Sequence, residues 1–75
     1  MYLNAKPKAI YMKRKMLGLT QAEVAKLAGI GAMSLSRMEN DKNRVHPFRA
    51  KAVADVLGCS VDELFEEDFV RFKLF

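Results

Sequence analysis

The amino-acid sequence predicts an all-α fold of five short helices in one domain covering residues 1–75. Apolar residues recur at helical spacing, most of these segments begin at a proline or end at a glycine, and a chain of 75 residues can form one modest core. The segments expected to be helical are residues 7–17, 21–28, 32–39, 47–57 and a short fifth helix starting after Ser60. The core of this domain spans about residues 7–66.

Proline suits the first turn of a helix, so Pro7 and Pro47 should open the first and fourth helices. The first helix should turn inward Ile10, Arg14 and Leu17, and the fourth Ala50, Val53, Ala54 and Leu57. Ser60 and Glu63 form a capping box for the fifth helix. The apolar residues expected in that helix are Val61, Leu64 and Phe65. Residues 40–46 read as a polar loop.

Residues 20–39 are the most informative segment. Thr20 and Glu23 form another capping box, Gly29 suits a left-handed turn, and Ile30 should plug the turn before Gly31 caps the next helix. In the helix over residues 21–28, the expected inward residues are Val24, Leu27 and Ala28, with the small Ala25 beside them. In the helix over residues 32–39, they are Leu35 and Met38. The outward residues of the helix over residues 32–39 are then Ala32, Met33, Ser34, Ser36 and Arg37. Two helices joined this way are typical of proteins that present a helix to the DNA major groove.

The net charge of +4 is unevenly distributed. Residues 1–61 hold 11 of the 13 Lys and Arg but only 4 of the 9 Asp and Glu. A basic body with an acidic end suits a polyanionic partner on one side, although ordinary scatter on a solvated surface gives the same count. The helix-turn-helix pattern favours the polyanion.

The last residues alternate apolar and basic side chains, which indicates a strand over residues 70–74. Its nearest candidate partner is residues 2–4, so we expect a small two-stranded β ribbon formed by the termini, with a frayed tail as the alternative. Residues 67–75 would then supply a dimer contact. The apolar side chains that would make it are Phe69, Phe72, Leu74 and Phe75.

The sequence offers little that would support an enzyme. His46 stands alone beside Pro47, without a cysteine nearby, and is expected to be a cap or an exposed residue. The single cysteine, Cys59, excludes an intramolecular disulfide and suits a small buried position in a protein of the reducing cytoplasm. We expect no cofactor, no metal, no small-molecule substrate and no membrane segment.

Residues 8–66 resemble the Cro and phage repressor family of helix-turn-helix proteins (the XRE type). The resemblance rests on several fragments in order: Leu17-Gly18-Leu19-Thr20-Gln21, Arg37-Met38-Glu39-Asn40, Val53-Ala54, Leu57-Gly58 and residues 60–65. It implies a five-helix lambda-repressor-like fold that binds double-stranded operator DNA.

The resemblance also implies which residues touch DNA. The positions that read base edges are Ala32, Met33, Ser36 and Arg37, and those that contact phosphates are Gln21, Ser34, Asn40, Lys42 and Arg44. Ala32 and Met33 depart from the polar amide side chains common at the start of the family's reading helix, but they can pack against thymine methyl groups. The alternative for Met33 is a place in the core.

The family's matching positions also pair Arg14 with Glu39. A charge on an inward stripe needs a partner, which favours this structural ion pair over two independent surface charges. The expected function is therefore that of a sequence-specific transcriptional repressor acting as a homodimer. The competing interpretation is a protein-interaction module of the same fold, with Ala32, Met33 and the tail as its partner surface.

Overall fold

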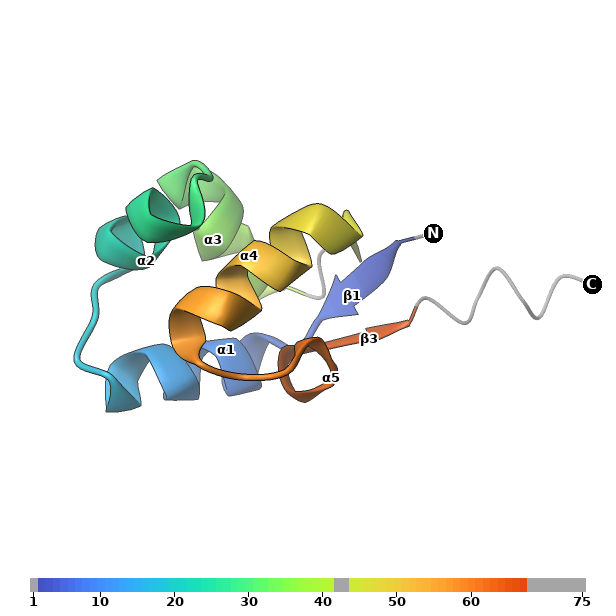
Figure 1. Ribbon diagram of the computed structural model, residues 1–75, viewed down its shortest axis with the longest axis horizontal. Coiled ribbons are helices and arrows are strands. Elements are labelled where there is room, and N and C mark those ends of the chain that lie inside the picture. The colour runs from blue at the N-terminus through green and yellow to red at the C-terminus, as the bar shows by residue number, and fades with distance from the viewer. Residues whose placement is uncertain (1, 42–43, 68–75) are drawn as a thin grey trace, which may run out of the picture.

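The computed structural model describes residues 2–41 and 44–67, which form five helices and three short strands (Figure 1). The helices are α1 (Pro7–Met16), α2 (Gln21–Ala28), α3 (Ala32–Asn40), α4 (Pro47–Leu57) and α5 (Val61–Leu64). The strands are β1 (Leu3–Ala5), β2 (Arg44–Val45) and β3 (Phe65–Glu67). The fold class predicted from the sequence is confirmed, and the bounds of α1 to α4 differ from the expected ones by one residue at most.

Local signals in the sequence set the helix ends. The Thr20 hydroxyl accepts a hydrogen bond from the Glu23 backbone N–H at 3.1 Å, and the Thr20 N–H donates to Glu23 Oε1 at 2.8 Å, so the capping box opens α2. Gly29 and Gly58 end α2 and α4 with φ of 71° and 68°, a conformation that suits glycine. His46 caps α4 because its Nδ1 accepts from the Phe48 N–H at 3.2 Å.

The core lies between α4 and the other helices. α2 packs against both α3 and α4, while α1 packs against α3 and α5. The largest fully buried side chains are Phe65, Ile10, Leu35, Met38, Leu57, Leu64, Val24 and Val53. Cys59 packs at the edge of this core, where burial raises the pKa of its thiol. None of the helices in the described part of the chain is long and apolar enough to span a membrane.

Two of the expected inward residues, Leu17 and Leu27, are instead exposed. Leu17 is the residue after the last turn of α1, so it does not share the buried side of that helix. α2 buries Val24 and Ala25, with Ala28 partly buried, and Leu27 projects to one side of the face that these residues define. Both expectations were wrong because the spacing alone did not locate the centre of the buried face.

The strands form one antiparallel sheet in the order β2-β1-β3. Leu3 pairs with Val45 on one side and with Glu67 on the other. Both edges of β1 are therefore occupied, and the expected pairing of residues 2–4 with residues 70–74 is wrong at Leu3 and Asn4. Residues 70–74 themselves lie outside the described residues. β2 also replaces part of the expected loop.

Phe65 is a further difference, because it begins β3 rather than lying in the fifth helix. Its backbone is extended, with φ of −139° and ψ of 158°, and its side chain is fully buried. The short α5 thus leads the chain directly onto the sheet. In Figure 1 the sheet lies at one end of the molecule and the connection between α1 and α2 at the other.

Candidate nucleic-acid interface

α2 and α3 form a compact helix-turn-helix. Gly29 adopts the left-handed conformation, and the Ile30 N–H then donates to the Ala25 carbonyl at 2.9 Å. Ile30 packs against the core, as predicted for a residue that plugs the turn. Gly31, with extended backbone, starts α3. The turn therefore sets the angle between the two helices through local backbone hydrogen bonds and one packed side chain.

α3 turns two residues inward and leaves its other face accessible. Leu35 and Met38 are fully buried, whereas Met33 is 70% exposed. The core alternative for Met33 is therefore wrong. Ala32 and Arg37 are exposed beside it, and Ser34 and Ser36 are half-buried. The exposed face thus combines small, apolar and basic side chains on one rigid helix.

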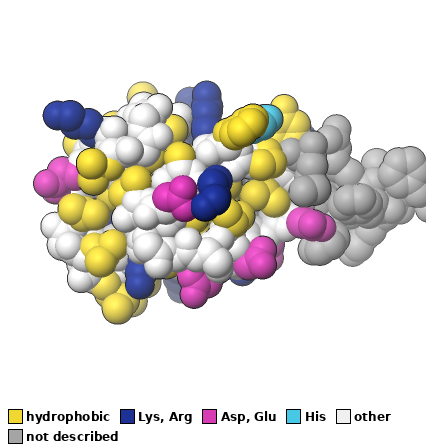
Figure 2. Space-filling view, in the orientation of Figure 1, with side chains coloured by type: hydrophobic (Ala, Val, Ile, Leu, Met, Phe, Trp, Pro, Cys, Tyr) yellow, Lys and Arg dark blue, Asp and Glu magenta, His cyan; other side chains and the backbone are white. Residues whose placement is uncertain are grey.

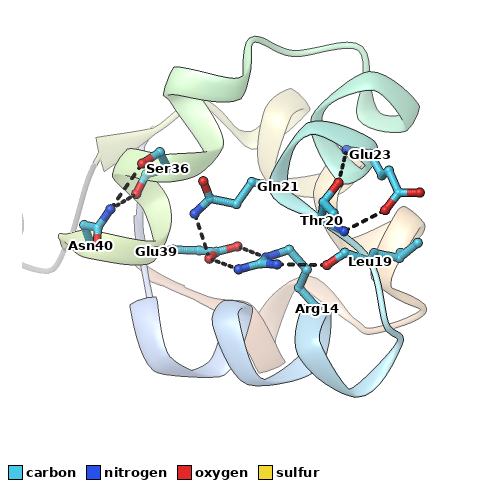
Figure 3. Close-up of polar contacts among 8 residues, drawn as sticks. All are labelled: Arg14, Leu19, Thr20, Gln21, Glu23, Ser36, Glu39 and Asn40. Carbon is cyan, nitrogen blue, oxygen red and sulfur yellow. Dashed lines mark hydrogen bonds and ion pairs between the residues drawn. The ribbon is translucent and has the colours of Figure 1, made fainter.

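An ion pair joins α1 to the end of α3 (Figure 3). Arg14 Nε donates to Glu39 Oε2 at 2.6 Å, and Arg14 Nη2 donates to Glu39 Oε1 at 2.9 Å. The two side chains are only 9% and 2% exposed. The hydrogen bonds to Glu39 raise the pKa of Arg14 above its ordinary value. Arg14 Nη1 also donates to the Leu19 carbonyl at 2.8 Å, so the pair fixes the α1–α2 connection too.

Gln21, at the start of α2, belongs to the same network. Its Nε2 donates to Glu39 Oε1 at 3.1 Å (Figure 3). The sequence did not predict this bond, because it depends on how α2 crosses the end of α3. Figure 3 shows Arg14, Gln21 and Glu39 converging from three different helices. The carboxylate of Glu39 is therefore shared by two donors.

An open hollow of about 470 Å³ lies at the N-terminal end of α2. Its lining residues are Arg14, Lys15, Gly18, Leu19, Thr20, Gln21 and Ala22. Backbone N–H groups at a helix N-terminus favour anions, and Lys15 adds an exposed positive charge at the rim. The hollow thus has the chemistry of a phosphate contact.

The remaining predicted phosphate contacts are dispersed. Asn40 Nδ2 donates to the Ser36 carbonyl at 2.8 Å and to Ser36 Oγ at 3.2 Å, so its side chain folds back along α3. Arg44 stands on β2, where its guanidinium lies 4.9 Å from the centre of the Tyr2 ring. Lys42 lies outside the described residues, as do the four expected dimer contacts in the tail.

A second group of residues, which the sequence did not reveal, gathers around His46 at the start of α4. His46 and Phe48 stack with their ring centres 5.2 Å apart and their planes at 7°, and Tyr2 meets His46 edge-on at 6.2 Å. Strand β2 has only two residues, too few to show a strand period. No signal in the sequence could therefore have placed Tyr2 beside His46.

Comparison with known proteins identifies the family. A profile of the helix-turn-helix family matches residues 10–64, which is most of the chain. The chain belongs to the XRE-type helix-turn-helix family. No curated protein sequence matches it. Among solved structures, the chain is similar to the crystal structure of SinR, the master regulator for biofilm formation, in complex with DNA. The TM-score is 0.68 and the identity 29%, over 75% of this chain and 90% of that one.

Proposed function

We propose that this protein is a sequence-specific transcriptional repressor that binds operator DNA with α3 in the major groove. The observation that carries the proposal is the exposed face of α3, which is held in place by the buried Arg14–Glu39 pair. The similarity to SinR, which was solved bound to DNA, supports the same mode of docking.

The exposed face of α3 suits direct reading of base edges. Ala32 and Met33 can pack against thymine methyl groups, while Arg37 is the one long donor among the four proposed base contacts and can reach guanine. Ser36 Oγ accepts from Asn40, so its hydroxyl hydrogen remains available to a base acceptor. Arg37 is therefore the residue that contributes most to discrimination between base pairs.

Phosphate contacts would set the register of α3 without reading sequence. The hollow at the start of α2 takes one phosphate, with Gln21 oriented by Glu39 before DNA arrives. The other proposed phosphate contacts are Ser34 and Asn40 on α3 and Lys42, which follows α3 in the sequence. Arg44 is left out of this set because its guanidinium lies over Tyr2 on the sheet.

The repressor would act as a homodimer. A single helix-turn-helix covers a short half-site, and two-fold pairing doubles the contacted length. The sequence of the tail, with Phe69, Phe72, Leu74 and Phe75, supplies apolar surface for such a contact.

Duplex binding measured by fluorescence anisotropy at several salt concentrations tests the function. Lys15→Ala should lower the slope of log affinity against log salt by about 1 and weaken all sequences alike. Lys51→Ala is the matched control, because Lys51 is paired with Asp55 on the exposed side of α4, and should leave the slope unchanged.

The competing function is a protein-interaction module of the same fold, favoured by the 70% exposure of Met33. Under that function the unmodified protein would show no salt-dependent affinity for any duplex. Such a result would overturn the proposed repressor.

A further inference from the structure

The pairing register of the sheet places a positive, a neutral and a negative side chain on its outer face, the face turned away from the core. Asn4 on the central strand pairs with Arg44 on one side and with Glu66 on the other. Directly paired residues of antiparallel strands project from the same face of a sheet. The neighbouring positions Leu3 and Val45 are buried, so they mark the opposite face as the core side. The outer face therefore runs from positive through neutral to negative across β2, β1 and β3.

An aromatic cluster, consisting of Tyr2, His46 and Phe48, continues this outer face. Tyr2 precedes Asn4 by two residues and so lies on the same side, where the Arg44 guanidinium covers its ring. Phe48 is 82% exposed, although it stacks on His46 and its backbone N–H is held by His46 Nδ1. Figure 2 shows hydrophobic side chains gathered on the surface at this end of the molecule.

The cluster has the properties of a protein contact. Exposed aromatic rings that are already held in place lose little conformational freedom on binding, and aromatic residues are enriched at interface centres. Phe48 keeps 82% of its surface exposed despite stacking on His46, so most of its ring remains available to a partner. This face is thus better explained by a partner than by solvent.

We propose that the outer face of the sheet packs against the same face of a second copy of this chain. The inference rests on the proposed homodimer and assigns its interface. A two-fold axis between the sheets and parallel to the strands would place β2 of one copy opposite β3 of the other. Arg44 then faces the partner's Glu66, and symmetry repeats this contact. A two-fold axis across the strands would instead set Arg44 against the partner's Arg44, which like charges disfavour.

The proposed axis makes β2 of one copy run parallel to β3 of the other. β3 and β2 both run antiparallel to β1, so they point in the same direction. A sheet face of three short strands is smaller than the roughly 800 Å² per partner of a standard interface, so we expect concentration-dependent pairing. Binding to adjacent half-sites on one duplex raises the effective concentration of the second copy.

Charge reversal tests the pairing, with sedimentation velocity over a range of protein concentrations as the measurement. Arg44→Glu and Glu66→Arg, each alone, place like charges across both symmetric contacts. Each should raise the dimer dissociation constant by about tenfold or more. An equimolar mixture of the two variants restores opposite charges at both contacts. The mixture should therefore dimerise nearly as well as the unmodified protein.

Two controls separate this effect from net charge and from folding. Glu67→Arg makes the same charge change one residue along β3, but Glu67 pairs with Leu3 and projects from the other face. It should leave dimerisation unchanged. Phe48→Ser should also weaken the dimer by about tenfold, with an unaltered circular-dichroism spectrum, because so exposed a side chain contributes little to the core.

Three results would overturn the inference. The unmodified protein could remain monomeric at every concentration, or the mixed variants could fail to dimerise. Alternatively, deleting residues 69–75 could abolish a dimer that none of the sheet variants affects, which would assign the interface to the tail alone. Binding of Glu66→Arg to a single half-site separates this question from the proposed function. If the Glu66→Arg variant is monomeric and still binds a half-site, the proposed dimer interface is supported. If the unmodified protein dimerises but binds no DNA, only the proposed repressor function is refuted.

Discussion

Glu39 holds Arg14 through two hydrogen bonds, of 2.6 and 2.9 Å, at a place where both side chains are almost completely removed from solvent. Removing two charges from water costs free energy that their attraction only partly offsets. The pair therefore contributes more to the orientation of α3 than to overall stability. Gln21 shares the same carboxylate, so the start of α2 is oriented by it as well.

A double-mutant cycle should show strong coupling between these two residues. Arg14→Met or Glu39→Gln alone leaves the other group buried without its charge partner, and each should lower the free energy of unfolding by about 3 kcal/mol. The double variant should be more stable than either single one. Urea denaturation followed by circular dichroism measures all four proteins. Small, additive effects would instead indicate two independent charges.

The capping box of α2 should make stability depend on acid pH. The Thr20 backbone N–H, which donates to the Glu23 carboxylate, lowers the pKa of Glu23 in the folded protein below its ordinary value of 4.5, and the Thr20 side chain acts in the same direction. A carboxylate with a lowered folded pKa stabilises the fold above its unfolded pKa and loses that contribution as the pH falls through the folded one.

We therefore expect Glu23→Gln to melt at a lower temperature than the unmodified protein at pH 7, and this gap to narrow below pH 4.5. Thermal melts from pH 7 to pH 2 provide the measurement. Glu67→Gln, which changes an exposed carboxylate on β3, is the control. A gap that stays constant across this range would show that the Glu23 charge has no part in the cap.

Two leucines with similar sequence context should respond differently to truncation. Leu35→Ala removes a fully buried side chain and should cost about 2–5 kcal/mol of stability. Leu27→Ala removes an exposed one and should change stability by about 0.5 kcal/mol at most. Urea denaturation distinguishes them. Equal costs would place Leu27 in the core, as its spacing first indicated.

Signals close together in the sequence predicted much of this fold. Thr20 with Glu23 marks the start of α2, Gly58 marks the end of α4, and Pro47 marks its beginning. Each of these signals reflects local backbone geometry or capping, so it can be recognised without knowledge of the tertiary structure. The resemblance to the repressor family implied the Arg14–Glu39 pair, and the need of a charge on an apolar stripe for compensation favoured it.

The sheet could not be predicted in the same way. Its central strand pairs with two segments distant in sequence, and β2 contains only Arg44 and Val45. The bond from Gln21 to Glu39 and the stacking of Tyr2 against His46 likewise depend on tertiary geometry. The alternation of apolar and basic residues led to the prediction of a strand over residues 70–74. The observed strand β3 contains two glutamates and lacks such a pattern.

Selection of bound sites from random duplex DNA, carried out with the unmodified protein and with Arg37→Ala, tests the central claim most directly. If α3 reads the major groove, the unmodified protein selects a defined sequence. Arg37→Ala should then lose about 1–3 kcal/mol on the best site and relax the preference at one base pair. Lys42→Ala should weaken all sites alike while keeping their order. An unchanged ranking of sites for Arg37→Ala would contradict the assignment of α3 as the reading helix.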